Sequence, residues 1–218
     1  MQYVLVNNGY VINGPRGWNH RSFESTLDED LEISLRLPFQ KDDAEPILVN
    51  DTTKILPATL VYPEYNAKIE YLDGPYWTYD DDFATGTFEV KDQPIEYVKQ
   101  TLIGGVAANR YIKENLGTTT EIQGSVITVD TSRDGRAIFV QAYTLMAEDG
   151  TINWKFPEGW FVLSKPELGQ VVGAGATYVQ SCFDWEQSKT VEINNCTTLE
   201  ELNNIDIGDP VPPEASAI

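Results

Sequence analysis

Few residues of this sequence have types and spacing suited to catalysis or metal binding. The one histidine, His20, lies in RGWNHRSF, which we expect to be a loop and where a surface or capping role is favoured over a Ser/His/Asp or Cys/His mechanism. Cys182 and Cys196 lack CxxC or Cys/His spacing, which favours two reduced, partly buried thiols over a disulfide or a zinc site. Residues 80–82 are three aspartates without the spacing of a calcium loop, so we interpret them as a solvated acidic loop. We expect no metal and no cofactor.

Aromatic residues are concentrated in INWKFPEGWFVLSKPEL, residues 152–168. If this stretch is a hairpin, Trp154 and Phe156 share one face, while Trp160 and Phe161 point to opposite faces. That spacing favours a hydrophobic core over a patch that stacks on sugars or docks a peptide. A glycan-cleaving enzyme would need a carboxylate pair in a cleft lined by Trp154 or Trp77, and no pair stands out among the 34 acidic residues.

The charge balance argues against whole classes of partner. The 218 residues include 15 Lys plus Arg and 34 Asp plus Glu, a net charge of -19 that is spread along the chain. Such a surface repels phosphates, and no cluster of basic residues offsets it, so we expect neither nucleic acid nor a membrane surface as a partner. The start, MQYVLVNNGY, does not resemble a signal peptide, and no stretch is apolar enough to span a membrane, which predicts synthesis in a cytoplasm.

The first 93 residues show the period of two that is typical of β-strands. Residues 2–6 and 10–12 flank Asn7-Asn8-Gly9, which predicts a hairpin. Alternation from Leu31 to Leu37 predicts a further strand, and shorter ones are indicated near residues 47–49, 59–62, 67–71 and 85–90. We therefore expect a small β-rich docking module over residues 1–93.

After residue 93 the pattern changes to that of a helix, from Pro94 to Gly117. Its residues recur at alternating steps of three and four, which defines a heptad seam. The seam consists of Ile95, Val98, Leu102, Gly105, Asn109, Ile112 and Leu116. Packing inside the domain is favoured over self-association, and Asn109 is a candidate for setting the register against another helix.

The remaining sequence predicts two hairpins and three helices. One hairpin covers residues 120–129, followed by a helix capped by Thr131 and Asp134, and the aromatic hairpin leads into a helix from about 166 to 189 capped by Ser164 and Glu167. Gly169 and Gly173 belong to a face of small residues that allows a close approach of another backbone. We expect an α+β fold: a small β-rich domain, a helix-hairpin-helix-hairpin-helix-helix domain over residues 94–208, and an extended tail over residues 209–218.

Four stretches of the second half carry a specific likeness. VAANRYIKENLG (106–117), ITVDTSRDGRAIFVQAYTLMA (127–147), WKFPEGWFVLSKPELGQVVGAGATYVQSCFDWE (154–186) and CTTLEELNNID (196–206) together resemble a domain of unassigned function common among tail and tail-fibre genes of tailed bacteriophages. The opening, VLVNNGYVINGPRGWNHRSFES, is similar to the start of such proteins. The motifs are caps, turns and core aromatics, so the resemblance implies a location and a role but no catalytic residue.

The resemblance implies a virion protein of the phage tail, a baseplate or tail-fibre connector that acts by protein–protein docking. Its partners would be fibre, baseplate or tail-tube proteins and further copies of itself, with the heptad seam, Gly169 and Gly173 as candidate interface. A tail-fibre assembly chaperone is the alternative, and a host-surface polysaccharide depolymerase is a remote one.

Overall fold

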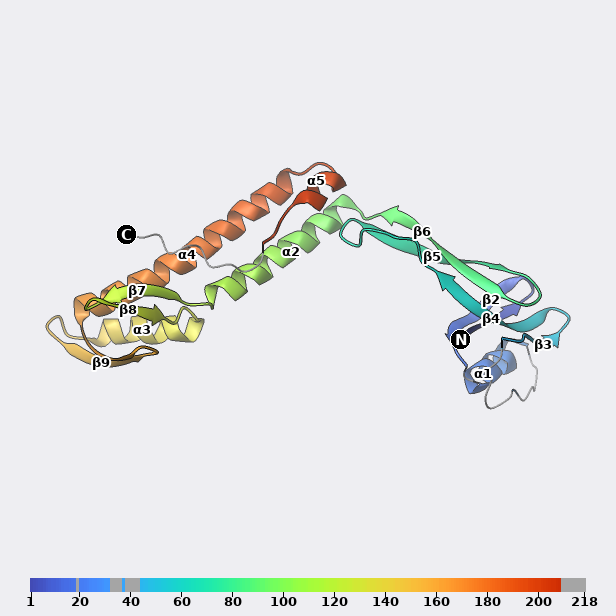
Figure 1. Cartoon of the computed structure of the whole chain (residues 1–218), viewed down its shortest axis with the longest axis horizontal. Helices are drawn as coiled ribbons and strands as arrows, with labels where there is room; N and C mark the ends of the chain where they lie inside the picture. The colour runs from blue at the N-terminus through green and yellow to red at the C-terminus, as the bar shows by residue number, and fades with distance from the viewer. Residues whose placement is uncertain (19, 32–36, 38–43, 209–218) are drawn as a thin grey trace. The chain divides into compact units, whose positions relative to one another are not determined.

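The computed structural model describes residues 1–18, 20–31, 37 and 44–208 of the chain. The chain divides into two compact units, Met1–Gln93 and Pro94–Ile218, which are described separately (Figure 1). The mixed α+β class, with strands dominating the first unit and helices more prominent later, is confirmed. Within the described residues, none of the helices is long and apolar enough to cross a membrane.

The N-terminal unit is built on one six-stranded sheet with the order β2-β1-β4-β6-β5, in which β3 also pairs with β4. Strands β4 and β6 are parallel, and the other pairs are antiparallel. Asn8 and Gly9, at φ 47° and 85°, make the predicted turn between the first two strands. The elements are β1 (Gln2–Asn7), β2 (Tyr10–Gly17), α1 (His20–Leu31), β3 (Ile47–Asn50), β4 (Thr53–Val61), β5 (Glu70–Tyr79) and β6 (Ala84–Asp92).

Strand β1 is the centre of this unit because it is buried on both faces. Tyr3 and Leu5 point to one face, where Phe23 and Leu27 of α1 join their cluster. The opposite face is a second apolar cluster of Val4, Val6, Leu56, Ala58 and Ala84. The alternation of β1 thus supplies two cores at once, which a single strand can do only in the interior of a sheet.

Helix α1 corrects two predictions from the sequence. The RGWNHRSF stretch was expected to be a loop, but the helix begins at His20 within it. Leu31 was expected to begin a strand, but it is the last residue of α1; residues 32–36 of that predicted strand lie outside the described part, and Leu37 is buried. Phe23 and Leu27 are four residues apart, which places the phenyl ring and the leucine side chain on one face of the helix.

The C-terminal unit contains two long helices that lie side by side, α2 and α4 (Figure 1). Helix α3 and the β7-β8 hairpin pack against α4, and α5 packs against α2. The elements are α2 (Ile95–Glu114), β7 (Thr118–Ile122), β8 (Ser125–Val129), α3 (Arg133–Leu145), β9 (Thr151–Phe156), β10 (Gly159–Ser164), α4 (Lys165–Asn195) and α5 (Leu199–Asn204). The main core is formed by Ile122, Ile127, Val129, Phe139, Phe156, Leu163, Leu168 and Val171.

Local capping explains where α3 and α4 begin. The predicted Ser164–Glu167 pair is confirmed: the Glu167 carboxylate accepts hydrogen bonds from the Ser164 amide at 2.8 Å and the Ser164 hydroxyl at 2.7 Å. These bonds lower the pKa of Glu167. The cap of α3 is Ser132, which accepts from a backbone amide at 3.1 Å, and not Thr131 as predicted. Thr131 is fully buried, and its hydroxyl accepts from the Gly117 amide at 3.0 Å, so it closes a turn instead.

Candidate functional site

The heptad positions predicted on α2 do not form one face. Val98 and Leu102 are buried inside the unit, whereas Ile112 is exposed. Leu116 is also exposed, but it lies beyond the end of α2, which stops at Glu114 and not at Gly117 as predicted. The next buried apolar residue after Leu102 is Val106, which the seam omits. An α-helix turns through 3.6 residues rather than 3.5, so a straight helix drifts away from a strict heptad count. The inward face of α2 therefore serves packing within its own unit, and only the end of the predicted seam stays accessible.

The other seam residues of α2 hold the segment that follows α5. The Asn109 amide donates to the carbonyl of Gly208 at 2.8 Å and to that of Ile207 at 3.4 Å. A Cβ at Gly105 would lie 2.8 Å from Cδ1 of Ile207, so a larger residue there would displace the end of that side chain. Ile95 is half-buried in the first turn. The Asn109 amide is thus engaged by its own chain, which corrects the expectation that it sets a register against another helix.

The small-residue face of α4 is covered in part. Tyr143 of α3 lies over Gly169, with its ring 3.1 Å from the position a Cβ would take. Gly173 is exposed, and among the described residues no atom outside its own helical turn lies within 4 Å of the position a Cβ would take. Gly169 is therefore explained by packing within the unit, and Gly173 is available to a neighbour.

The aromatic cluster is mostly core, as the sequence predicted. Trp154 stacks on Phe139 of α3 at 4.7 Å between ring centroids, and Phe156 is buried with Phe161 edge-on at 5.7 Å. Trp160 is the exception, because 71% of it is exposed. The rings therefore form no continuous sugar-stacking platform, although one large indole remains on the surface.

Three elements are joined by a buried carboxylate, Glu114, at the end of α2. It pairs with Arg110 at 3.0 Å and with Arg133 of α3 at 3.5 Å, and Arg110 also pairs with Glu186 of α4 at 2.8 Å. Burial alone would lower the pKa of Arg110, but its two carboxylate partners outweigh that effect and raise it. The Arg110 guanidinium also lies 4.7 Å from the centroid of Phe183. This network accounts for two of the three arginines in the C-terminal unit.

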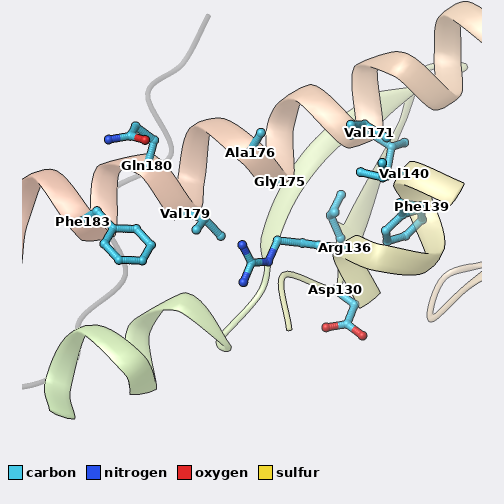
Figure 2. A pocket seen from close by; sticks show the side chains of 12 residues that line it. Asp130, Arg136, Phe139, Val140, Val171, Gly175, Ala176, Val179, Gln180 and Phe183 are labelled. Atoms are coloured by element: carbon cyan, nitrogen blue, oxygen red, sulfur yellow. The ribbon is translucent and has the colours of Figure 1, made fainter. Parts of the chain in front are cut away.

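The third arginine, Arg136, lines a cleft between α3 and α4 (Figure 2). The cleft has a volume of about 300 Å³. Strand β8 contributes to the cleft at its carboxyl end. We call this the Arg136 cleft. It is lined by Val129, Asp130, Arg136, Phe139, Val140, Val171, Val172, Gly175, Ala176, Val179, Gln180 and Phe183. Apart from Arg136, Asp130 and Gln180, every lining residue is apolar.

The two other polar residues of the cleft are occupied elsewhere. The Asp130 carboxylate accepts from the Ser132 amide at 2.8 Å and lies against Gly135, and Figure 2 shows it pointing away from the Arg136 guanidinium. The Gln180 amide donates to Asp184 at 2.8 Å. Nε of Arg136 is buried and has no hydrogen-bond partner in the described part of the chain. The cleft therefore presents one unpaired guanidinium among apolar walls.

Residues considered for metal or thiol chemistry have structural surroundings. Cys182 and Cys196 are free and more deeply buried than predicted, and burial raises the pKa of the Cys182 thiol. Asp80 accepts from the backbone amides of residues 82 and 83 at 2.8 Å, which closes the acidic loop, and Lys54 pairs with Asp81 at 2.9 Å. Among the residues described, no group of three or more His, Cys, Asp or Glu side chains could hold a metal ion.

Sequence reasoning missed the Arg136 cleft. A weak signal was present, since Val171, Gly175 and Val179 recur at four-residue steps and Arg136 follows a capped helix start. That signal indicates a helix face, but it does not show which element covers the face.

With α2, α3 and α4 arranged around two hairpins, residues 97–209 match a domain of unknown function, DUF4376. The match covers more than half of the chain, which belongs to this family. No curated protein and no solved structure matches the chain.

Proposed function

We propose that this protein is a structural component of a bacteriophage tail, a connector that joins a fibre or spike to the baseplate or tail by protein–protein docking. The observation that carries the proposal is a set of large apolar side chains exposed on the C-terminal unit. They are Val126, Ile138, Val140, Leu145, Trp160 and Val162, on α3 and the two hairpins. A contiguous apolar surface among these elements would mark an interaction site, because large exposed apolar patches are where soluble proteins bind partners.

The uncharged helix faces support docking between copies of the chain. From Leu168 to Phe183, α4 carries no charged residue, and neither does α2 from Gln100 to Asn109. In a chain with a net charge of -19, such faces are where two copies approach with least repulsion. Gly173 lies on the exposed side of this stretch. A symmetric homo-oligomer in the virion is therefore part of the proposal.

The N-terminal unit offers a second docking surface. Strand β5 is at the edge of the six-stranded sheet, and Tyr71, Tyr76 and Tyr79 on it are exposed. An edge strand presents unpaired backbone groups, and tyrosines supply apolar area with a polar end. Two units that each bind a neighbour act as an adaptor, because the first contact raises the local concentration for the second.

Mass spectrometry of purified phage particles tests the proposal. The chain should be present in a fixed ratio to the major tail protein, at roughly a small multiple of three or six copies per tail. Its absence from purified particles, with the chain found on unassembled fibre protein in the lysate, would refute a structural role and indicate an assembly chaperone.

A matched pair of variants connects this experiment to the surface. Trp160→Ser changes an indole that is 71% exposed, so folding should be retained while incorporation into particles falls. Val191→Ser changes an exposed residue near the far end of α4 and serves as the control. Equal incorporation of both variants would remove the apolar surface of the hairpins from the proposal.

A further inference from the structure

We infer that the Arg136 cleft binds a carboxylate side chain of a partner protein, presented on a short segment with apolar side chains on both sides of it. This inference rests on the proposed docking function and names the chemistry of one partner. It begins from the charge pattern of the C-terminal unit. Arg110 and Arg133 each pair with glutamates, while Arg136 has no ion pair within the described residues.

Helix stability does not explain Arg136. It lies in the fourth position of α3, near the helix N-terminus, where the helix dipole disfavours a cation. Its Nε is buried without an acceptor, and a buried donor without a partner is destabilising. Nε is covered, so an acceptor that arrives with a partner would meet the other guanidinium nitrogens in the cleft and offset part of this cost.

The apolar walls and the single arginine of the cleft favour a ligand with one negative charge and apolar groups around it. Val129, Phe139 and Val179 are apolar walls, so a small hydrated anion would lose water there without enough compensation. A phosphate monoester carries nearly two negative charges and is ordinarily held by several arginines, whereas this cleft has one in a strongly acidic chain. A carboxylate accepts the guanidinium in bidentate fashion and matches its single charge.

The length of the cleft suits a polypeptide segment. Its α4 wall runs from Val171 to Phe183, twelve helical steps or about 18 Å. An extended chain of about five residues has that length. The occupant is therefore a segment with a central Asp or Glu, whose neighbouring apolar side chains contact the valines and Phe183.

NMR titration of the full ¹⁵N-labelled chain tests the inference with two peptides that differ in one group. Acetyl-Leu-Glu-Leu-amide should shift the Arg136 Nε–H signal and the amides of Val179 and Phe183 in a saturable way. Acetyl-Leu-Gln-Leu-amide should bind about tenfold more weakly, since a charge-assisted hydrogen bond is replaced by a neutral one. Equal binding of the two, or no saturable shift below about 10 mM, would overturn the inference.

Variants assign the preference to one side chain. Arg136→Gln should remove the preference for the Glu peptide, and Arg133→Gln, with the same change of charge three residues away, should keep it. Ala176→Glu, at an exposed position that lines the cleft, provides a second test that does not depend on the folding of the Arg136→Gln variant. It should weaken the binding of the Glu peptide more than that of the Gln peptide. A preference that survives Arg136→Gln would overturn the inference.

Two other occupants give distinct results. Shifts of the same signals that depend on protein concentration, without peptide, would assign the cleft to a second copy. Peptide binding that is seen only after residues 209–218 are removed would assign it to that segment. Either result overturns the inference. Since the titration uses the isolated chain, it can fail while the protein is found in virions, and it can succeed when the protein is absent from them.

Discussion

Replacing Glu114 by alanine should destabilise the C-terminal unit more than any change of a surface acid. Only 1% of Glu114 is exposed, and it pairs with Arg110 at 3.0 Å and Arg133 at 3.5 Å. Removing one member of a buried ion pair typically costs about 3–5 kcal/mol, because the remaining charge is left without compensation. The structure tells which end of that range applies.

Arg110 is not left alone in the variant, because it retains Glu186 at 2.8 Å. Arg133 is 68% exposed and returns to water, so its contact with Glu114 adds at most about 1 kcal/mol. We therefore expect Glu114→Ala to lower the free energy of unfolding by about 3 kcal/mol, the lower end of the range.

Urea unfolding measures this loss of unfolding free energy. Monitoring it by hydrogen-exchange mass spectrometry on peptides of α2 and α4 restricts the measurement to the C-terminal unit. Glu148→Ala is the matched control: its side chain is 91% exposed and pairs with Lys165 at 2.7 Å, so its loss should stay below about 1 kcal/mol. If Glu114→Ala costs no more than the control, the network of Glu114 does not hold α2, α3 and α4 together, and the reasoning fails.

Four further predictions concern protonation and packing. Burial raises the pKa of Tyr178 to about 12, so the stability that the neutral phenol contributes is complete below pH 10 and lost between pH 10 and 12. An absorbance titration should show one tyrosine that ionises at unusually high pH, and Tyr178→Phe should remove that transition. The lowered pKa of Glu167 acts in the opposite sense: its stability is present above pH 4.5 and lost in more acidic solution, which a Glu167→Gln variant should not show in acid unfolding. Gly173→Ala should stabilise the chain by about 0.5–1 kcal/mol in thermal unfolding, because the position is open and helical. Gly86→Ala should destabilise it, since a Cβ there would lie 2.8 Å from Leu60 and 3.0 Å from the Trp77 ring; equal effects at the two glycines would contradict one of the two assignments.

Local chemistry accounts for the parts of the fold that the sequence predicted well. The turn at Asn8-Gly9 needs positive φ at both residues, and the Ser164–Glu167 cap needs two side chains three residues apart. Each feature depends on residues that are neighbours in the chain, so the amino-acid sequence alone is enough to predict it. The strand-rich first unit and the more helical second unit follow from summing such signals.

Which face of a helix is buried could not be predicted from neighbouring residues, because it depends on residues distant in the chain. On α2 the apolar positions allow either a heptad seam or the drifting face that begins at Val98 and includes Val106, and only the packing against α4 selects the second. The Arg136 cleft is harder still, because Arg133 and Arg136 look alike in the sequence. One reaches Glu114, nineteen residues earlier in the chain, and the other reaches no carboxylate among the residues described.

Salt separates the two kinds of docking that the C-terminal unit offers. Contact through Trp160 buries apolar area, which is insensitive to moderate ionic strength, whereas a carboxylate on Arg136 gains from attraction that salt screens over about 10 Å at 0.1 M and about 3 Å at 1 M. Raising NaCl from about 0.1 to 1 M should therefore weaken the binding of acetyl-Leu-Glu-Leu-amide in the NMR titration. The affinity of acetyl-Leu-Gln-Leu-amide should stay nearly unchanged, because that peptide has no charge. The protein's net charge of -19 has the opposite effect on the affinity, because it repels an anionic peptide and salt also screens that repulsion. Tighter binding of the Glu peptide at high salt would mean that the repulsion from the acidic surface outweighs Arg136, and the guanidinium could not be the feature that attracts a partner.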